Sequence, residues 1–419
     1  MSDIIITGMG IVSALGNNVE ENLCALRANR SGIAPMRYLK TSHTEFPVGE
    51  VKMTNEEMMR LLNIPEHQPT IRTALMGTLA VREALQSVRQ SHISNPRIAF
   101  ISGTTVGGMD KSEQYYLDFF ENDSRNAYIS THDCGSCTEI IADYFGIFSQ
   151  VDTISTACSS AANAIILGAE LLKSGRADIV VAGGSECLTK FHLNGFNSLM
   201  ILDREPCRPF DATRAGINLG EGAAYVVMER GGDKRYAICD MRQEICDSHK
   251  SQITNRKSQI VLSGYANTCD AFHQTASSPD GEGAYLAMKQ ALENANLQPQ
   301  DIDYINAHGT GTGNNDASEG IAVVRLFGEK IPPISSTKSF TGHTTSAAGC
   351  VESVISILAL QHNFIPSNLN FSEKMPEVPF EPYLDVRQSD MGCEISLKHI
   401  LCNSFGFGGN DSALIFSRF

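Results

Sequence analysis

One cysteine and two histidines in this sequence stand where side chains can do covalent chemistry. Cys158 follows the strand-like stretch VDTIST and opens a long run of small, apolar, helix-forming residues. A thiol at a helix N-terminus meets unpaired N–H groups and the positive end of the helix dipole, which favour the thiolate. The same N–H groups can stabilise an oxyanion on a carbonyl group under attack. Cys158 is therefore a candidate nucleophile, and the alternative is a buried structural cysteine.

The two histidines lie in Gly/Thr-rich turns at predicted strand ends. His308 stands in NAHGTGTGNND and His343 in STKSFTGHTTSAAG. Histidines in such turns point into a site more often than into a core, and a thiolate nucleophile needs polar partners that handle protons and charge. We expect Cys158, His308 and His343 to converge on one site.

The stretches that must position these residues indicate an α/β protein, because apolar strand-like runs alternate with helical ones along the chain. The predicted strands cover 4–7, 98–102, 178–184, 259–267 and 303–309. The predicted helices cover 71–88, 281–295 and 347–361, in addition to the helix after Cys158.

The two halves of the chain resemble each other. Each has a strand that ends in a Gly/Thr turn, then a small-residue helix, then a Gly-rich turn that feeds a strand; these last turns lie in NLGEGAAYVVME and FGFGGNDSALIFS. Such repetition predicts a duplication that buries two small-residue helices side by side. The polar stretch at 241–257 is the candidate boundary between a half at 1–250 that carries the cysteine and a half at 251–419 that carries the histidine pair.

The composition favours an acidic protein without nucleic-acid or membrane partners. The 33 Lys and Arg residues against 47 Asp and Glu give a net charge of -14, and no basic run could bind phosphate backbones. No apolar run approaches the length of a membrane span, and the start MSDIIITGMG is not a basic signal peptide. We expect a cytoplasmic protein whose 12 cysteines are reduced.

Two other motifs are weaker. ITGMGIVSALG has two glycines after the first strand, as in dinucleotide-binding proteins, but Ser13 stands where that fingerprint needs Gly or Ala. Cys134 and Cys137 in DCGSC form a bare Cys-x-x-Cys, which could serve zinc or redox chemistry or simply pack the start of a helix.

Four motifs together carry a family resemblance: TACSS, NAHGTGTGNNDASE, SSTKSFTGHTTSAAG and NSFGFGGND. In this order and spacing they resemble the β-ketoacyl-acyl-carrier-protein synthases, the condensing enzymes of the thiolase superfamily. The likeness runs from residue 6 to residue 416. It implies a thiolase-like five-layered α-β-α-β-α fold built from two duplicated halves, and a homodimer.

The resemblance also implies roles for the three reactive residues. Cys158 would take an acyl chain from the phosphopantetheine arm of an acyl carrier protein, and His308 and His343 would hold the thioester carbonyl of the malonyl donor. The backbone N–H groups of Cys158 and Phe407 would hold the oxyanion. No bound cofactor and no metal are implied, because the carrier protein supplies the phosphopantetheine.

Further roles follow from the same resemblance. Lys338 would be catalytic, and the carboxylates Asp316, Glu319 and Glu352 would support it from behind the reacting residues, although isolated groups of these types are usually solvated. The implied pantetheine ligands are Thr310 and Thr312; the gate is Phe407 with Phe405; the acyl pocket has Val106 and Phe196; and Arg125 and Arg208 are candidate carrier-protein contacts. For the threonines and the apolar residues among these, the alternative is ordinary turn or core packing.

The subtype expected is an elongating, synthase II-like enzyme, a 3-oxoacyl-[acyl-carrier-protein] synthase that performs a decarboxylative Claisen condensation in fatty-acid elongation. Initiating synthases usually carry Asn where this chain has His343, and a thiolase would have a second cysteine near Phe405. A ketosynthase of a dedicated polyene, polyketide or secondary lipid pathway is the alternative, and a non-catalytic carrier-protein binder is a remoter one.

The sequence departs from the family pattern at two places near the site. The usual Leu-Leu-Gly after the second histidine is Thr344-Thr345-Ser346, which makes the wall near His343 polar. The usual ending GFGGTN is GFGGND, so that Asn410 and Asp411 stand in place of Thr and Asn.

Overall fold

The computed structural model describes residues 3–86, 95–231, 259–384 and 396–419. The stretch at 241–257, the candidate boundary between the halves at 1–250 and 251–419, lies outside the described residues.

The strands form a ten-stranded sheet in the order β3-β2-β4-β5-β1-β6-β10-β9-β7-β8. Read outward from its middle, the two halves follow the same pattern, β1-β5-β4-β2-β3 and β6-β10-β9-β7-β8. From the middle outward, each side has two antiparallel pairings and then two parallel ones. Within the described part of the sheet, the two sides join where Ile4 and Ile5 of β1 pair with Leu262 and Val261 of β6. This repetition confirms the duplicated fold.

The strands of the first half are β1 (Ile4–Val12), β2 (Ile98–Gly103), β3 (Gln150–Ile154), β4 (Ile179–Glu186) and β5 (Gly222–Arg230). Those of the second half are β6 (Ile260–Cys269), β7 (Tyr304–Asn306), β8 (Ile334–Ser335), β9 (His399–Gly406) and β10 (Asn410–Arg418).

The helices of the first half are α1 (Val19–Arg27), α2 (Asn55–Leu62), α3 (Arg72–Gln86), α4 (Met109–Tyr115), α5 (Cys134–Phe145), α6 (Ser160–Lys173) and α7 (Lys190–Ser198). Those of the second half are α8 (Glu282–Ala295), α9 (Gly313–Phe327), α10 (Lys338–Thr341) and α11 (Ala348–His362). Short 3₁₀ turns are η1 (Asp118–Phe120), η2 (Asn126–Tyr128), η3 (Pro299–Asp301) and η4 (Thr345–Ala347).

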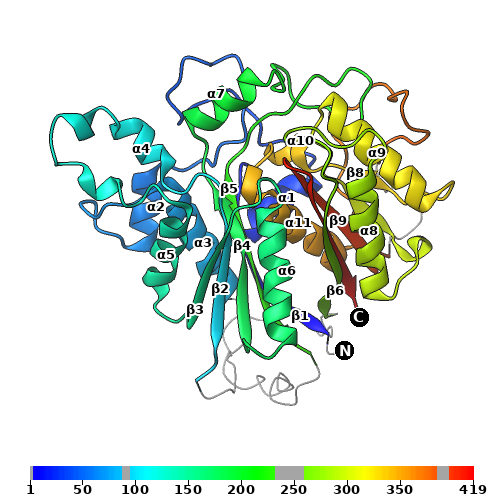
Figure 1. Cartoon of the computed structure of the whole chain (residues 1–419), viewed down its shortest axis with the longest axis horizontal. Coiled ribbons are helices and arrows are strands. Elements are labelled where there is room, and N and C mark those ends of the chain that lie inside the picture. Colours follow the sequence, from blue (N-terminus) through cyan, green and yellow to red (C-terminus); the bar gives the residue numbers. More distant parts are fainter. Residues whose placement is uncertain (1–2, 87–94, 232–258, 385–395) are drawn as a thin grey trace.

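The helices lie in three layers around the two halves of the sheet (Figure 1). One core cluster joins α2, α3 and α5 to the outer face of the first half, and another joins α8 and α9 to the outer face of the second. The largest cluster lies between the halves and is built around α6 and α11. The layers are therefore α-β-α-β-α, as expected from the sequence.

Small residues let the two middle helices approach each other closely. A Cβ atom on Gly349 of α11 would stand only 2.7 Å from the backbone nitrogen of Ala162 and 2.8 Å from its Cβ on α6. On the other side of α6, a Cβ on Gly103 would stand 2.7 Å from the nitrogen of Ala161. The starts of both helices are thus held at fixed positions between the halves.

The two weaker motifs have structural roles. Gly8 and Gly10 lie inside β1 and pair with Val227 and Tyr225 of β5, so ITGMG is strand and not a nucleotide-binding turn. Cys134 begins α5 and Cys137 is fully buried in the outer core; burial raises the pKa of both thiols. Among the described residues, no helix has the length and apolar character required to cross a bilayer.

The close approach of α6 and α11 predicts that two glycine-to-alanine substitutions differ in their effect on the free energy of unfolding. Gly349→Ala should lower the free energy of unfolding by about 1–3 kcal/mol, because the added methyl group overpacks the helix contact. Gly135→Ala, at a helical glycine with nothing within 4 Å of the added atom, should leave stability unchanged or slightly increased. Urea denaturation of both variants measures this, and equal stability of the two would contradict the packing described here.

Candidate active site

The turn before α6 aims the Cys158 side chain into the interior. Ala157 has a φ of 51°, in the left-handed region that non-glycine residues rarely adopt. The turn is held by Ser160, whose hydroxyl donates to the Ala157 carbonyl at 2.7 Å and accepts from the Thr156 N–H at 2.9 Å. Cys158 thus lies two residues before the first helical residue, and Ser159 is the N-cap.

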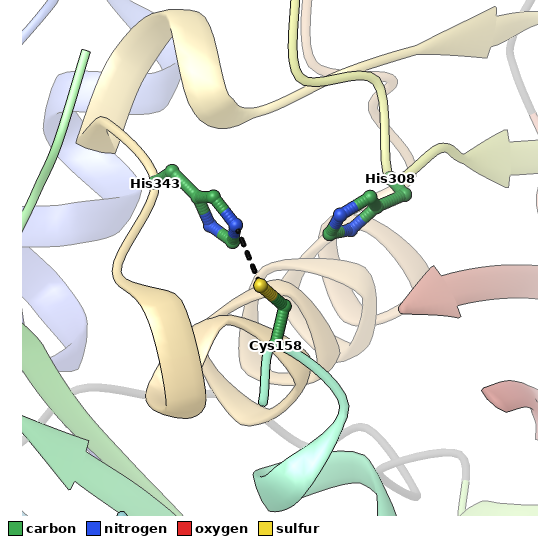
Figure 2. A group of neighbouring side chains, drawn as sticks. All are labelled: Cys158, His308 and His343. Atoms are coloured by element: carbon green, nitrogen blue, oxygen red, sulfur yellow. Dashed lines mark hydrogen bonds between the residues drawn. The ribbon is translucent and has the colours of Figure 1, made fainter. Parts of the chain in front are cut away.

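Cys158, His308 and His343 converge, as Figure 2 shows. The Cys158 Sγ lies 3.1 Å from His343 Nε2, and the two imidazole rings are 5.3 Å apart between centroids at an angle of 83°. Ligand atoms of the three residues all lie within 4.8 Å of one another. All three side chains are buried, so their mutual interactions are little screened by water.

Each histidine is placed by backbone contacts from another element. The His343 N–H donates to the Asn218 carbonyl at 2.8 Å, and the His343 carbonyl accepts from the Gly220 N–H at 2.9 Å. The His308 N–H donates to Glu319 Oε1 at 2.9 Å. The first half of the chain therefore helps to position a histidine of the second.

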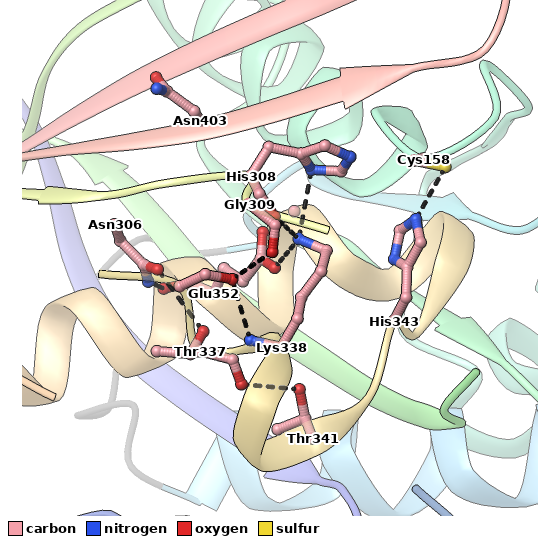
Figure 3. Close-up of polar contacts among 12 residues, drawn as sticks. Cys158, Asn306, His308, Gly309, Thr337, Lys338, Thr341, His343, Glu352 and Asn403 are labelled. Carbon is pink, nitrogen blue, oxygen red and sulfur yellow. Dashed lines mark hydrogen bonds and ion pairs between the residues drawn. The ribbon is translucent and has the colours of Figure 1, made fainter. Parts of the chain in front are cut away.

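Lys338 is buried below the histidines with only 1% of its surface exposed (Figure 3). Its Nζ donates to the His308 carbonyl at 2.6 Å and to Glu352 Oε1, and it lies 3.2 Å from His308 Nδ1. The three N–H bonds of the ammonium group thus have three acceptors. Since His308 Nδ1 faces a donor, the proton of the neutral imidazole must lie on Nε2, which faces the cavity.

Asp316 and Glu319 contact the 308–311 turn and not Lys338 itself. Within the described residues, Lys338 pairs with Glu352 alone. Glu319 accepts from the His308 and Gly309 N–H groups, and Asp316 accepts from the Phe210 and Gly311 N–H groups. These carboxylates hold the backbone of the 308–311 turn, which explains why two buried acids stand there without a cation.

The thiol of Cys158 is not a preformed thiolate, contrary to the sequence-based expectation. Burial raises the pKa of Cys158 to about 11, although Lys338 and the backbone N–H of Phe407 act in the opposite direction. Burial and the nearby Lys338 ammonium lower the pKa of His308 and of His343 well below the usual range. A neutral thiol beside a neutral imidazole predicts that nucleophilic sulfur forms by proton transfer to His343 Nε2 during the reaction.

The two histidines differ in the surroundings of their Nδ1 atoms. His308 Nδ1 contacts Lys338, whereas His343 Nδ1 is buried and has no hydrogen-bond partner among the described residues. No contact therefore fixes the tautomer of His343. This imidazole can accept a proton at Nε2 in one step and donate a hydrogen bond from Nε2 in another.

A cavity of about 250 Å³ opens above the Cys158 thiol. Thr310 and Thr312 line it and their hydroxyls lie 2.9 Å apart. Phe407 stacks on Phe196 with ring centroids 5.7 Å apart at the same cavity. Its lining also includes Ile201, Ile217, Thr275, Ala276, Ser277, Asn314, Asn315, Phe405 and Gly406.

Val106 is the predicted pocket residue that the structure does not bring to this cavity. It is 1% exposed and packs in the outer core of the first half with α3 and α5. Phe405 lies against the catalytic side, with its ring centroid 5.8 Å from that of His308.

The two arginines proposed as carrier contacts are differently placed. Arg125 is exposed, and its guanidinium lies 4.6 Å from the ring centroid of Tyr115. Arg208 is already paired with Asp203 at 2.9 Å, and its side chain is 23% exposed.

Asn410 positions the nucleophile, a role that the sequence reasoning missed. Its Oδ1 accepts from the Ser159 hydroxyl at 2.7 Å and from the side-chain amides of Asn163 and Asn267 at 2.8 Å. It therefore joins β10, β6 and the start of α6 next to Cys158. The departure from the family pattern at this position was the available signal.

A second missed group surrounds Glu186 at the end of β4. This fully buried carboxylate accepts from the hydroxyls of Thr104, Thr105 and Ser346, and it lies 3.8 Å from His192 Nε2. Three hydroxyl donors satisfy the charge. Ser346, one of the departures after His343, thus completes a polar cluster beside the site.

Comparisons with known proteins agree with this geometry over the whole chain. Two family models match, "Beta-ketoacyl synthase, N-terminal domain" at residues 1–234 and "Beta-ketoacyl synthase, C-terminal domain" at residues 260–372. The 3-oxoacyl-[acyl-carrier-protein] synthase 2 of Coxiella burnetii is 30% identical, with 99% of this chain and 98% of that protein covered.

Two solved structures are also similar. The ketosynthase of Xenorhabdus doucetiae in complex with its chain length factor has a TM-score of 0.82 and 30% identity, covering 100% of this chain and 98% of that one. A type II polyketide ketosynthase in complex with its acyl carrier protein and bound to the hexaketide has a TM-score of 0.81 and 25% identity, with both chains fully covered.

The layered, duplicated fold and the buried Cys-His-His site define a thiolase-like condensing enzyme, an acyltransferase that forms a carbon–carbon bond. Within that class, the chain belongs to the β-ketoacyl synthase family, whose N-terminal and C-terminal domain models both match it.

The raised pKa of Cys158 predicts how its alkylation by iodoacetamide depends on pH. Because the thiol ionises only near pH 11, the rate should rise about tenfold per pH unit between pH 7 and pH 9. Mass spectrometry of the peptide that carries Cys158 separates it from the exposed Cys24 and Cys269. A rate that stays constant over this range would show a preformed thiolate and contradict the account.

Proposed function

We propose that the chain is an elongating, synthase II-like 3-oxoacyl-[acyl-carrier-protein] synthase. It condenses malonyl-[acyl-carrier-protein] with an acyl chain held as a thioester on Cys158. The observation that carries this proposal is the contact of the Cys158 thiol with His343, next to a His308 whose tautomer is set by Lys338. No bound cofactor takes part, because the carrier protein brings the phosphopantetheine.

The first half-reaction moves the acyl chain onto the enzyme. The Cys158 thiol gives its proton to His343 Nε2, and the sulfur attacks the thioester carbonyl of the acyl carrier protein. The N–H of Phe407, which already donates to the Cys158 sulfur, lies beside that carbonyl, and with the Cys158 N–H it stabilises the oxyanion. Collapse expels the pantetheine thiolate, which takes the proton back from His343.

The second half-reaction makes the new bond. Malonyl pantetheine enters through the cavity along Thr310 and Thr312, and its thioester oxygen accepts hydrogen bonds from Nε2 of His308 and of His343. Loss of CO2 leaves an enolate whose charge these two donors stabilise in a dry site. The enolate carbon attacks the acyl carbonyl on Cys158, and the cysteine sulfur leaves as a thiolate while the 3-oxoacyl product forms. One proton from solvent then restores the neutral thiol.

Two pathways fit this chemistry. Fatty-acid elongation is supported by the likeness to the Coxiella burnetii synthase, and a dedicated polyene, polyketide or secondary lipid pathway by the equal identity to the Xenorhabdus doucetiae ketosynthase. We favour elongation as the activity and leave the cytoplasmic location as a prediction. A thiolase is disfavoured, because Phe405 and Gly406 stand where its second cysteine would be.

The proposed partner is an acyl carrier protein, and its docking surface is poor in cations. Around α2, Arg60 is exposed beside Glu56 and Glu57. Arg208 is engaged by Asp203. Docking through these residues should be weak and sensitive to salt, or should serve a carrier less acidic than usual.

Substitutions at Cys158 and His308 should separate the half-reactions. Cys158→Ala should abolish both acylation and condensation. His308→Ala should lower malonyl decarboxylation by about 10²–10³-fold, the usual loss for one oxyanion donor, yet still permit an acyl adduct on Cys158.

Mass spectrometry of Cys158 after incubation with a panel of acyl-carrier thioesters, saturated and 3-oxo, measures the first half-reaction, and CO2 release measures the second. Condensation by the Cys158→Ala variant would refute the nucleophile. Labelling of Cys158 without any decarboxylation by the wild-type protein would instead support a non-catalytic carrier-protein binder.

We also propose that two copies associate through the free edge of β3. At the other end of the sheet, the edge strand β8 is covered, since the Ile334 carbonyl accepts from Tyr383 and the Ser336 N–H donates to Asn368. Apolar side chains 39–74% exposed lie on β3 and the segments around it: Tyr116, Leu117, Phe120, Ile129, Tyr144, Ile147 and Val151. A second copy would cover this surface.

If two copies associate through the edge of β3, charged substitutions on this surface should weaken the dimer. Leu117→Asp combined with Phe120→Asp should weaken the dimer at least tenfold in sedimentation velocity, because two carboxylates would be buried without partners. Phe419→Asp, at an aromatic residue 71% exposed at the chain end, is the matched control and should have no effect. A wild-type protein that stays monomeric at micromolar concentration would refute the proposal.

A further inference from the structure

Two loops at the mouth of the cavity are joined to each other. The β9–β10 turn carries Phe407, and the loop after β6 supplies Thr275 to the cavity wall. The Gly408 N–H donates to the Gln274 carbonyl at 2.8 Å. The Asp270 N–H donates to the Gly409 carbonyl at 3.1 Å. The position of the Phe407 turn, and with it the oxyanion N–H, therefore depends on this junction.

Two aspartate side chains lie close together at the junction. A Cβ atom on Gly283 would stand 2.1 Å from Asp411 Oδ2 and 2.7 Å from Asp270 Cβ, so both acid side chains pack against one point of α8. Asp270 also touches the turn itself, because a Cβ on Gly409 would stand 2.0 Å from Asp270 Oδ1. Asp411 is 4% exposed.

The two acids have unequal partners. Asp270 accepts from the Phe272 N–H at 3.1 Å and the Ser278 N–H at 3.0 Å, which stabilise its charged form. No N–H or O–H group of another described residue donates a hydrogen bond to the Asp411 carboxyl group, and none of these residues forms an ion pair with it. It needs either a donor or a proton of its own.

In the part of the chain that the structure describes, no cation on the elements packed around Asp411 pairs with its carboxyl group. Glu319 on α9 faces it, and Arg325 on the same helix is bound by Glu282 and the Asp280 carbonyl. The other titratable groups on the surrounding elements are Cys269 and His273 next to Asp270, and Tyr285 and Lys289 on α8, with Lys289 near Glu293.

These surroundings favour the neutral acid at Asp411. Burial raises the pKa of the Asp411 carboxyl to about 8, and the charges of Asp270 and Glu319 act in the same direction. Asp411 therefore keeps its proton at a pH below this value and loses it as the pH rises through the value.

We propose that Asp411 is a positioning residue whose carboxyl must keep its proton so that it can pack beside Asp270 without repulsion, and that this packing keeps the loop after β6 against the Phe407 turn. When the proton is lost, two adjacent carboxylates repel each other and the junction loosens. The consequence for catalysis rests on the proposed function, because Phe407 then no longer holds the oxyanion. The family pattern has Asn here, which cannot titrate, so the pH response is a property of this chain.

The direct test is an optical reporter on the loop, independent of catalysis. The chain has no tryptophan, so Phe272→Trp, at a side chain 53% exposed on the loop after β6, gives a single tryptophan that can be excited without the 11 tyrosines. Its fluorescence should show a transition centred near pH 8 that disappears when Asp411→Asn is added. Asp143→Asn, at an exposed acid on α5, is the matched control and should keep the transition.

Activity provides the second readout. The ratio of kcat/KM for Asp411→Asn to that of the wild type should be near one at pH 6.5 and rise to about tenfold at pH 9. At pH 9, one unit above the midpoint, about ten wild-type molecules have lost the Asp411 proton for each one that keeps it. Absence of the fluorescence transition in the wild-type background, or its persistence with Asp411→Asn, would overturn the inference. Absence of condensation alongside a normal transition would refute only the proposed function.

Discussion

A single buried ammonium group organises the reactive centre. Lys338 has all three of its N–H bonds directed at acceptors, one on Glu352 and two on His308. Removal of either member of such a buried pair leaves an uncompensated charge, which costs about 3–5 kcal/mol, so the arrangement holds as a unit. It sets the tautomer of His308, and with burial it keeps both imidazoles neutral. The remaining features follow from the need to present two neutral imidazoles to one sulfur.

The duplicated fold meets that need by bringing parts of both halves to the middle layer. Cys158 comes from the start of α6 in the first half, and His308 and His343 come from turns of the second half. The Asn218 carbonyl of the first half fixes His343, and Asn410 of the second half fixes the residue after Cys158. Because each half holds a residue of the other, the site exists only when both halves are folded and packed together.

Much of this arrangement could be predicted from the sequence, and the parts that could not have physical reasons. His308 and His343 stand in Gly/Thr-rich turns, and Cys158 stands between a strand-like stretch and a small-residue helix. Their protonation states could not be predicted, because burial by distant segments decides the pKa of Cys158. Chain spacing likewise could not show that Glu352 reaches Lys338 while Asp316 holds backbone N–H groups. Val106 was expected in the acyl pocket from the resemblance alone, and it lies in the outer core cluster of the first half and not in the lining of this cavity.

The central claim is that both imidazoles are uncharged while the thiol is protonated, so that one can act as base and both can act as hydrogen-bond donors. The most direct measurement is ¹⁵N NMR of histidine-labelled protein over pH 5.5–8, with His308→Gln and His343→Gln variants to assign the two resonances among 11 histidines. The account predicts neutral-imidazole shifts for His308 and His343 throughout, with the Nδ1 of His308 unprotonated. A charged imidazolium at either residue above pH 6 would contradict it.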